Sequence, residues 1–128
     1  MAKWVKSTVL DDGINVIKNT CTKMHLISAY TAGDADATVL ANTLTSTPVT
    51  MASGDFTLAS SGSNRTLTVT ASKTSTATAS AASPDLHIAF MTAANVVLWV
   101  TDETTNQAIT IGNPITFPGP VYTSNQPT

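Results

Sequence analysis

The chain has 128 residues, seven Asp and one Glu against five Lys and one Arg, and a net charge of −2. This balance argues against a nucleic-acid-binding protein, because phosphate recognition needs clustered positive charge. Only 11% of the residues are charged, against roughly a quarter in an average globular protein, and 24 Thr and 12 Ser supply most of the polar surface instead.

Length and apolar content predict one domain with one core. The sole cysteine, Cys21, cannot form a disulfide within the chain. No run of about 18 apolar residues is present, so we expect no membrane partner. The first six residues lack the apolar stretch of a signal peptide, which predicts a protein made and used without Sec export.

A short amphipathic helix is predicted near the N-terminus. Ser7 or Thr8 can cap its start, and Asn19 can end it in a left-handed conformation. Apolar residues at helical spacing predict one buried face: Val9, Leu10, Ile14 and Ile17. Because the helix is short, we expect it to be stable only when it packs against a sheet.

From Met24 onward the hydrophobic period is two, which predicts a strand over residues 24–28. Residues 31–46 are small and without a clear period. They predict a long excursion with one short turn of helix near Val39 and Leu40, and such loops are usually functional or mobile.

Short strands separated by turn residues are predicted after Pro48. The segment 73–83 is either a Thr-rich strand or a low-complexity loop. Residues 96–100 are apolar on both faces, which predicts a central strand. Pro118 and Pro120 cannot donate to a ladder, so the tail is an edge strand or an extended arm. The strands expected from the pattern are 49–51, 56–59, 65–71, 86–91, 95–101 and 107–111.

Strands without long helices between them predict an antiparallel all-β fold, a β-sandwich or a small barrel with one short N-terminal helix. Within the single domain we expect three parts. Residues 1–22 form an N-terminal segment with the helix, residues 23–117 form the β core, and residues 118–128 form an extended C-terminal arm.

No arrangement of residues predicts catalysis, so we expect no enzyme, no cofactor and no metal. His25 and His87 lie on predicted strands, where a histidine is usually structural. Cys21 and His25 would share a helix face only if the helix continued past Asn19. Asp34 and Asp36 offer oxygen ligands for calcium, but no EF-hand pattern follows them.

The remaining candidates are apolar and aromatic side chains, mainly near the two ends of the chain. Trp4 lies ahead of the helix, where it either packs on its own domain or anchors into a neighbouring subunit. A proline-rich tail suits an arm that lies along a partner, because proline reduces the ordering entropy lost on binding. The predicted partner-binding residues are Trp4, Tyr30, Val39, Leu40, Phe117, Pro118, Pro120 and Tyr122.

Several short motifs together resemble those of a known group of proteins. They are Met-Ala-Lys-Trp4, Thr8-Val-Leu10-Asp11, Met24-His-Leu-Ile-Ser-Ala29, Ser53-Gly-Asp-Phe-Thr57, Leu98-Trp-Val-Thr101 and Thr105-Asn-Gln-Ala-Ile-Thr110, followed by a proline-containing end. In these motifs the chain resembles small tailed-bacteriophage virion proteins of the capsid cement or decoration type. The segments 31–46 and 73–83 depart from that pattern.

The resemblance implies an all-β fold and a place on the capsid surface of a virion, after synthesis in the bacterial host cytoplasm. The implied partners are the major capsid protein and copies of the chain itself, as a dimer or trimer. One alternative is a phage tail, neck or host-adhesion module that binds a glycan through residues 31–46. Another is a β domain unconnected to virions.

Overall fold

The computed structural model of the protein describes residues 3–70 and 72–128. In these ranges nine strands form three antiparallel sheets, and one long helix lies near the N-terminus. The predicted antiparallel all-β fold with an N-terminal helix is therefore confirmed. Neither α-helix of the described ranges is long and apolar enough to cross a membrane.

Helix α1 (Ser7–Thr20) buries three of the residues predicted for its apolar face, Leu10, Ile14 and Ile17. The fourth, Val9, is 58% exposed. Successive helical residues point about 100° apart, so Val9 projects to one side of the buried stripe.

Both predicted ends of the helix are wrong in detail. Lys6 precedes the first turn and provides no side-chain cap, and the helix is followed by Cys21 in an extended conformation. The helix therefore depends on its packing rather than on its caps.

The largest sheet has four strands in the order β2-β1-β6-β7. They are β2 (Val49–Thr50), β1 (Lys23–Ile27), β6 (His87–Met91) and β7 (Val97–Val100). The prediction that residues 96–100 form a central strand is wrong, because β7 lies at the sheet edge and β6 is central. Residues of β7 are apolar on both faces because each face of the sheet is covered by a separate hydrophobic cluster.

One of these clusters lies under the excursion of residues 31–46. As predicted, this segment contains a short helix, α2 (Asp36–Ala41). Val39 of α2 packs with Ile27, Ala89 and Met91 from β1 and β6. The excursion is therefore a cover for one face of the sheet.

The opposite face of the four-stranded sheet packs against a two-stranded sheet of β5 (Lys73–Thr76) and β8 (Pro114–Phe117). Of the two alternatives for residues 73–83, the strand is correct for the first four residues. The predicted strand at 107–111 is wrong, since this segment makes only an isolated bridge between Ile109 and Ala81.

The third sheet contains β3 (Phe56–Ser61), β4 (Asn64–Val69) and β9 (Val121–Ser124) in that order, and a 3-10 turn, η1 (Ser53–Asp55), leads into it. Gly62, with a positive φ of 60°, closes the predicted hairpin between β3 and β4. Of the two alternatives for the tail, β9 is the edge strand.

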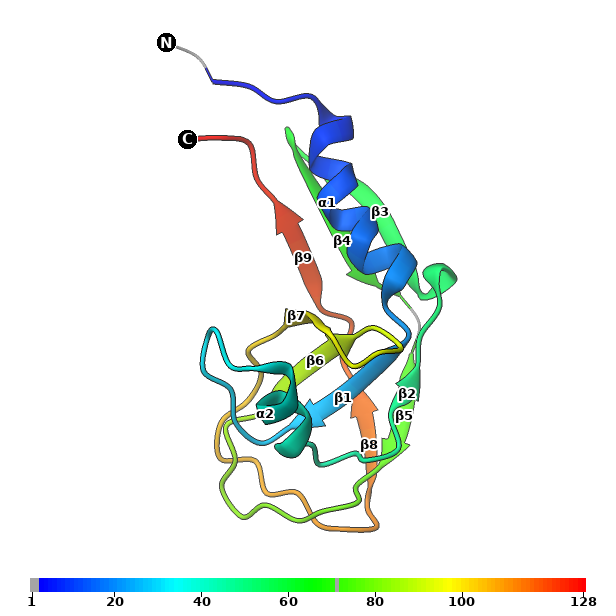
Figure 1. Ribbon diagram of the computed structural model, residues 1–128, viewed down its shortest axis with the longest axis vertical. Helices are drawn as coiled ribbons and strands as arrows, with labels where there is room; N and C mark the ends of the chain where they lie inside the picture. The colour runs from blue at the N-terminus through cyan, green and yellow to red at the C-terminus, as the bar shows by residue number, and fades with distance from the viewer. Residues whose placement is uncertain (1–2, 71) are drawn as a thin grey trace.

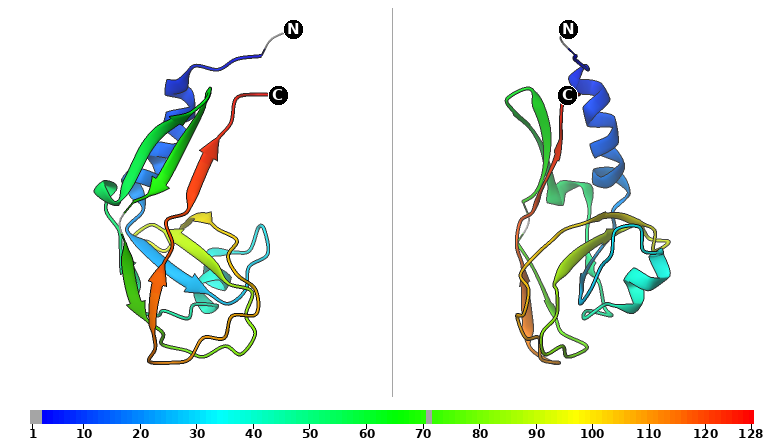
Figure 2. Two further views of the ribbon diagram at one scale, coloured as in Figure 1. Left: turned by 180° about the vertical axis from the view of Figure 1, so that it is seen from behind. Right: turned by 90° about the vertical axis from the view of Figure 1, so that its left-hand side faces the viewer.

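Figure 1 shows that these elements form two parts. The body contains the four-stranded and two-stranded sheets with α2. The arm, which consists of residues 3–20, 56–69 and 121–128, contains α1 and the three-stranded sheet and carries both chain ends. The arm projects from the body in each view of Figure 2.

One aromatic contact ties the arm to the body, and polar contacts hold the arm itself together. Near the body, the Trp99 ring meets the edge of Tyr122 at a centroid distance of 5.7 Å. Along its length, Arg65 Nε of β4 donates to Asp11 Oδ1 of α1 at 2.6 Å. At the tip, the side-chain amide of Gln126 both accepts from and donates to the backbone of Val5, each at 2.9 Å.

The connection between the body and the arm requires a glycine. A Cβ atom added to Gly119, between β8 and β9, would lie 2.6 Å from the carbonyl oxygen of Val69. That distance is far inside van der Waals contact, and the neighbouring atom belongs to the backbone, so the strands would have to separate.

We therefore expect Gly119→Ala to lower the free energy of unfolding by about 1–3 kcal/mol. Gly13→Ala is the matched control, because its added Cβ meets nothing within 4 Å. In the middle of a helix this control should stabilise the protein by about 0.5–1 kcal/mol. Urea unfolding measures both changes, and equal effects of the two substitutions would contradict the close approach.

Candidate functional site

Cys21 and His25, which were considered as a metal pair and set aside, have separate partners in the structure. The Cys21 thiol donates to the carbonyl oxygen of Lys23, and burial raises the pKa of this thiol to about 11. His25 Nδ1 lies 2.9 Å from the carbonyl oxygen of Thr45, which can only accept. Nδ1 of His25 therefore carries the ring proton. Cys21, whose thiol stays protonated at neutral pH, is an unreactive core residue.

Asp34 and Asp36 likewise serve separate backbone groups rather than one calcium ion. Asp34 Oδ2 accepts from the N–H of Thr31 at 2.8 Å and closes a turn. Asp36 Oδ1 accepts from the N–H of Val97 at 3.0 Å and ties α2 to the edge strand β7. Both carboxylates stabilise the excursion of residues 31–46.

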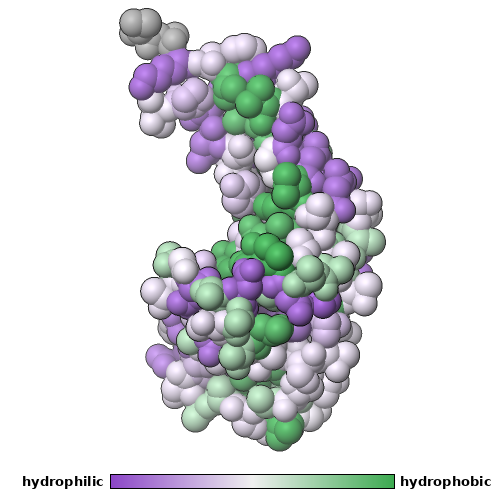
Figure 3. Space-filling model, viewed as in Figure 1, coloured by the Kyte–Doolittle hydropathy of each residue, from purple (hydrophilic) through white to green (hydrophobic). Residues whose placement is uncertain are grey.

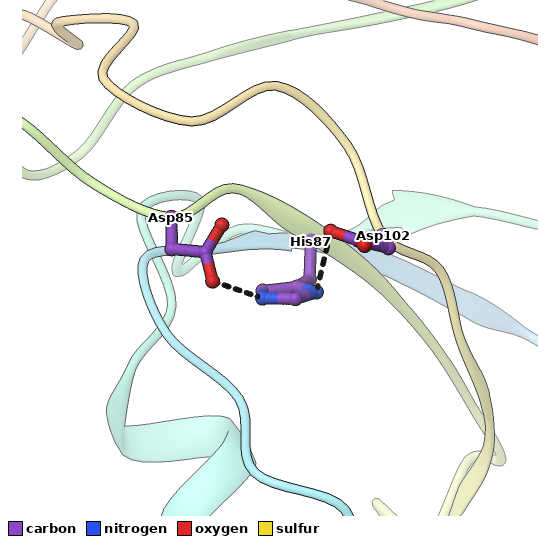
Figure 4. A group of neighbouring side chains, drawn as sticks. All are labelled: Asp85, His87 and Asp102. Carbon is purple, nitrogen blue, oxygen red and sulfur yellow. Dashed lines mark hydrogen bonds and ion pairs between the residues drawn. The ribbon is translucent and has the colours of Figure 1, made fainter.

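Among the described residues, one group of three potential metal ligands converges, and Figure 4 shows how its side chains lie. His87, at the start of β6, lies between Asp85 and Asp102. Its Nε2 is 3.2 Å from Asp85 Oδ2, and its Nδ1 is 4.0 Å from Asp102 Oδ1 and 2.7 Å from the carbonyl oxygen of Thr101. Local sequence pattern gave no sign of this cluster, because strand pairing brings its members together.

A cavity of about 300 Å³ lies between β8 and the segment 103–109. Phe117 and Pro118, two of the predicted partner-binding residues, contribute to its wall together with Leu86 and Ile88. Its one carboxylate, from Glu103, already accepts from the hydroxyl of Thr101 at 2.7 Å. The lining is mainly apolar and brings together no nucleophile with a base.

The arm carries most of the exposed large hydrophobic side chains of the described residues. Seven such side chains are exposed, and five belong to the arm: Trp4, Val9, Val16, Val121 and Tyr122. Trp4 is the most exposed, at 72%. Figure 3 shows hydrophobic surface that follows α1 along the arm, and a hollow between the arm and the body. We call these five residues the arm surface.

Trp4 and Tyr122 were predicted as partner-binding residues, and the structure places both on the arm surface. Pro118 and Pro120 flank the close approach at Gly119 and connect the body to the arm. The fold brings the segment of Trp4 and the strand of Tyr122 into one arm although they lie near opposite ends of the chain.

The other four predicted residues lie in the body. Val39 and Phe117 are core residues with 0% and 4% exposure, so in this structure neither side chain offers surface to a partner. Their apolar character serves the fold instead. Tyr30 and Leu40 are partly buried beside the cluster around Val39, and Tyr30 also packs edge-on against the His87 ring.

Sequence reasoning missed three members of the arm surface. Val9 was assigned to the buried helix face, and Val16 and Val121 were assigned no role. Val9 and Val16 are seven residues apart, a spacing that places them on one side of a helix. This pair of valines was the feature of the sequence that could have predicted a second apolar side of the helix.

Comparisons with protein-family models, curated proteins and solved structures found no match to this chain.

The buried imidazole of His25 makes the stability depend on pH. Burial lowers its pKa in the folded protein, and the charge of Lys23 adds to this effect. An unfolded histidine has a pKa of about 6.5, so below that pH the unfolded chain binds a proton that the folded chain does not.

We therefore expect the free energy of unfolding to fall as the pH is lowered from about 7.5 to about 5. Urea unfolding over this range measures the change. His25→Gln removes this titration, so the difference between the two pH values should shrink in the variant. The same pH dependence in both proteins would contradict this role of His25.

Proposed function

We propose that this protein is a structural, non-catalytic virion protein that binds and stabilises a tailed-phage head shell as a cement or decoration protein. The observation that carries the proposal is the arm surface, with Trp4, Val9 and Val16 exposed on an arm that projects from the body. The resemblance in the short sequence motifs supplies the class of partner.

The arm surface has the chemistry of a protein contact. Burial of apolar surface contributes about 25 cal/mol per Å², and one fully buried Val contributes about 1.5 kcal/mol or more. Trp is among the residues that most often dominate binding energy at interfaces. Gathered on one part of a weakly charged molecule, these side chains support a proposal of binding to other proteins.

The arm is also suited to binding because it is fixed before the partner arrives. The ion pair between Arg65 and Asp11 holds α1 on the sheet, and the Gln126 amide holds the two chain ends together. A preorganised surface loses less conformational entropy on binding. The expected partners are the major capsid protein and further copies of this chain.

Such a protein would act only by shifting the assembly equilibrium of the shell. A protein that binds the assembled shell and not the free subunits shifts the equilibrium toward the shell. Quantitative mass spectrometry of purified virions tests the location: a cement protein is present in hundreds of copies. A handful of copies per particle would overturn the head assignment in favour of a tail or neck module.

The arm surface predicts which substitutions weaken the attachment. Val9→Ser combined with Val16→Ser should weaken binding to shells that lack the protein by at least about tenfold, because two apolar contacts are lost. Both positions are more than half exposed, so the fold should be unaffected.

The matched control is Ile111→Ser, at a residue with 61% exposure in the turn before β8 of the body. This control should bind like the natural protein. Co-sedimentation of the purified variants with shells measures binding, and circular dichroism checks the fold. Equal loss of binding in the control and the double variant would contradict a role of the arm surface.

A further inference from the structure

In the cluster of Asp85, His87 and Asp102, both nitrogens of the His87 ring lie close to acceptor oxygens. His87 Nδ1 lies 2.7 Å from the carbonyl oxygen of Thr101. A carbonyl oxygen only accepts, so Nδ1 carries the ring proton. In the neutral ring, Nε2 then presents a lone pair.

That lone pair faces a second acceptor. Asp85 Oδ2 lies 3.2 Å from His87 Nε2, and an ionised carboxylate can only accept. The two atoms attract each other only when a positive species lies between them, which is either a proton on Nε2 or a metal ion that takes the place of that proton. Two ligands of a tetrahedral zinc ion, each at about 2.0–2.1 Å from the metal, lie roughly 3.3 Å apart. The observed separation therefore suits two ligands of one ion.

The histidine is oriented in advance, as metal-binding histidines are. Such residues donate their second ring nitrogen to a backbone carbonyl or a carboxylate, which fixes the ring and its tautomer. Here Thr101 is that acceptor, and its hydroxyl accepts from the N–H of Ile88 at 3.1 Å. Tyr30 packs edge-on against the imidazole with a centroid distance of 5.9 Å.

The carboxylates, by contrast, are free to adjust. The side chains of Asp85 and Asp102 are 53% and 86% exposed, whereas that of His87 is 9% exposed. One ligand atom from each of the three residues lies within 4.8 Å of the others. In this structure Asp102 Oδ1 lies by Nδ1, so the exposed Asp102 side chain would have to turn toward Nε2 to become a ligand.

We propose that Asp85, His87 and Asp102 form a binding site for a divalent metal ion of the zinc class, with His87 Nε2 and one oxygen from each aspartate as ligands. Imidazole nitrogen favours zinc-like ions, whereas calcium and magnesium favour oxygen ligands alone. Three protein ligands leave a position for water.

A bound ion would join two segments that backbone hydrogen bonds already hold side by side. Asp85 forms an isolated bridge with Thr105, and Leu86 exchanges backbone hydrogen bonds with the segment 103–104. These segments extend the pairing of β6 and β7 beyond the ends of the strands. The ion would lock this rim of the body. The site lies outside the arm surface, so the two proposals can fail independently.

Isothermal titration calorimetry with zinc chloride at neutral pH tests the site on the full chain after treatment with a chelator. We expect one zinc ion per chain. Asp85→Asn and Asp102→Asn should each weaken binding by at least about tenfold, the order expected when a metal site is disturbed. Asp12→Asn, at an exposed carboxylate of α1, is the matched control and should bind zinc unchanged.

These variants keep the experiment interpretable, because both aspartates are exposed and His87 itself stays in place. As a second readout, zinc should shift the ring signals of His87 in the NMR spectrum and leave those of the buried His25 unchanged. Absence of zinc uptake would overturn the proposal, as would uptake that both Asn variants retain. Calcium binding as tight as zinc binding would also overturn it, because the imidazole would then not be a ligand.

Discussion

The larger of the two hydrophobic clusters runs without a break from beneath α1 into the body, and the rest of the structure depends on this continuity. Ile14 and Ile17 of the helix and Leu67 of the arm sheet belong to the same cluster as Met24 and Phe90 of the four-stranded sheet. Burial of apolar surface is the main favourable contribution to folding. Because the arm contributes to the common core, it is an integral part of the domain, and its direction is set by packing.

This packing explains why the arm surface can be exposed and yet well placed. The buried stripe of α1 is used by the core, so Val9 and Val16 on its other side remain outside. The weakly charged, Thr-rich surface adds little charge repulsion between molecules, and charge is what normally keeps proteins apart. A shape with a fixed apolar arm thus suits lasting contact with other proteins, in agreement with the proposed role on a shell.

The two histidines show how the same residue type takes different roles in one sheet. His25 is enclosed by the excursion of residues 31–46, and burial lowers its pKa. His87 lies at the rim of the body, where Asp85 and Asp102 approach it from the neighbouring segments. The local sequence did not distinguish the two histidines, since both alternate with apolar residues on a predicted strand. Their surroundings, supplied by distant segments, distinguish a core residue from a candidate ligand.

The sequence by itself determined the local features of this protein: the antiparallel strands, the helix with its stripe at Ile14 and Ile17, and the short helix around Val39. These follow from periodicity and turn residues, which act over a few neighbours. Only the tertiary structure decided that β7 is an edge strand, that Phe117 is buried and that Trp4 lies on the same arm as Tyr122. Strand order, burial and the convergence of side chains depend on contacts between residues far apart in the chain, for which local pattern carries no information.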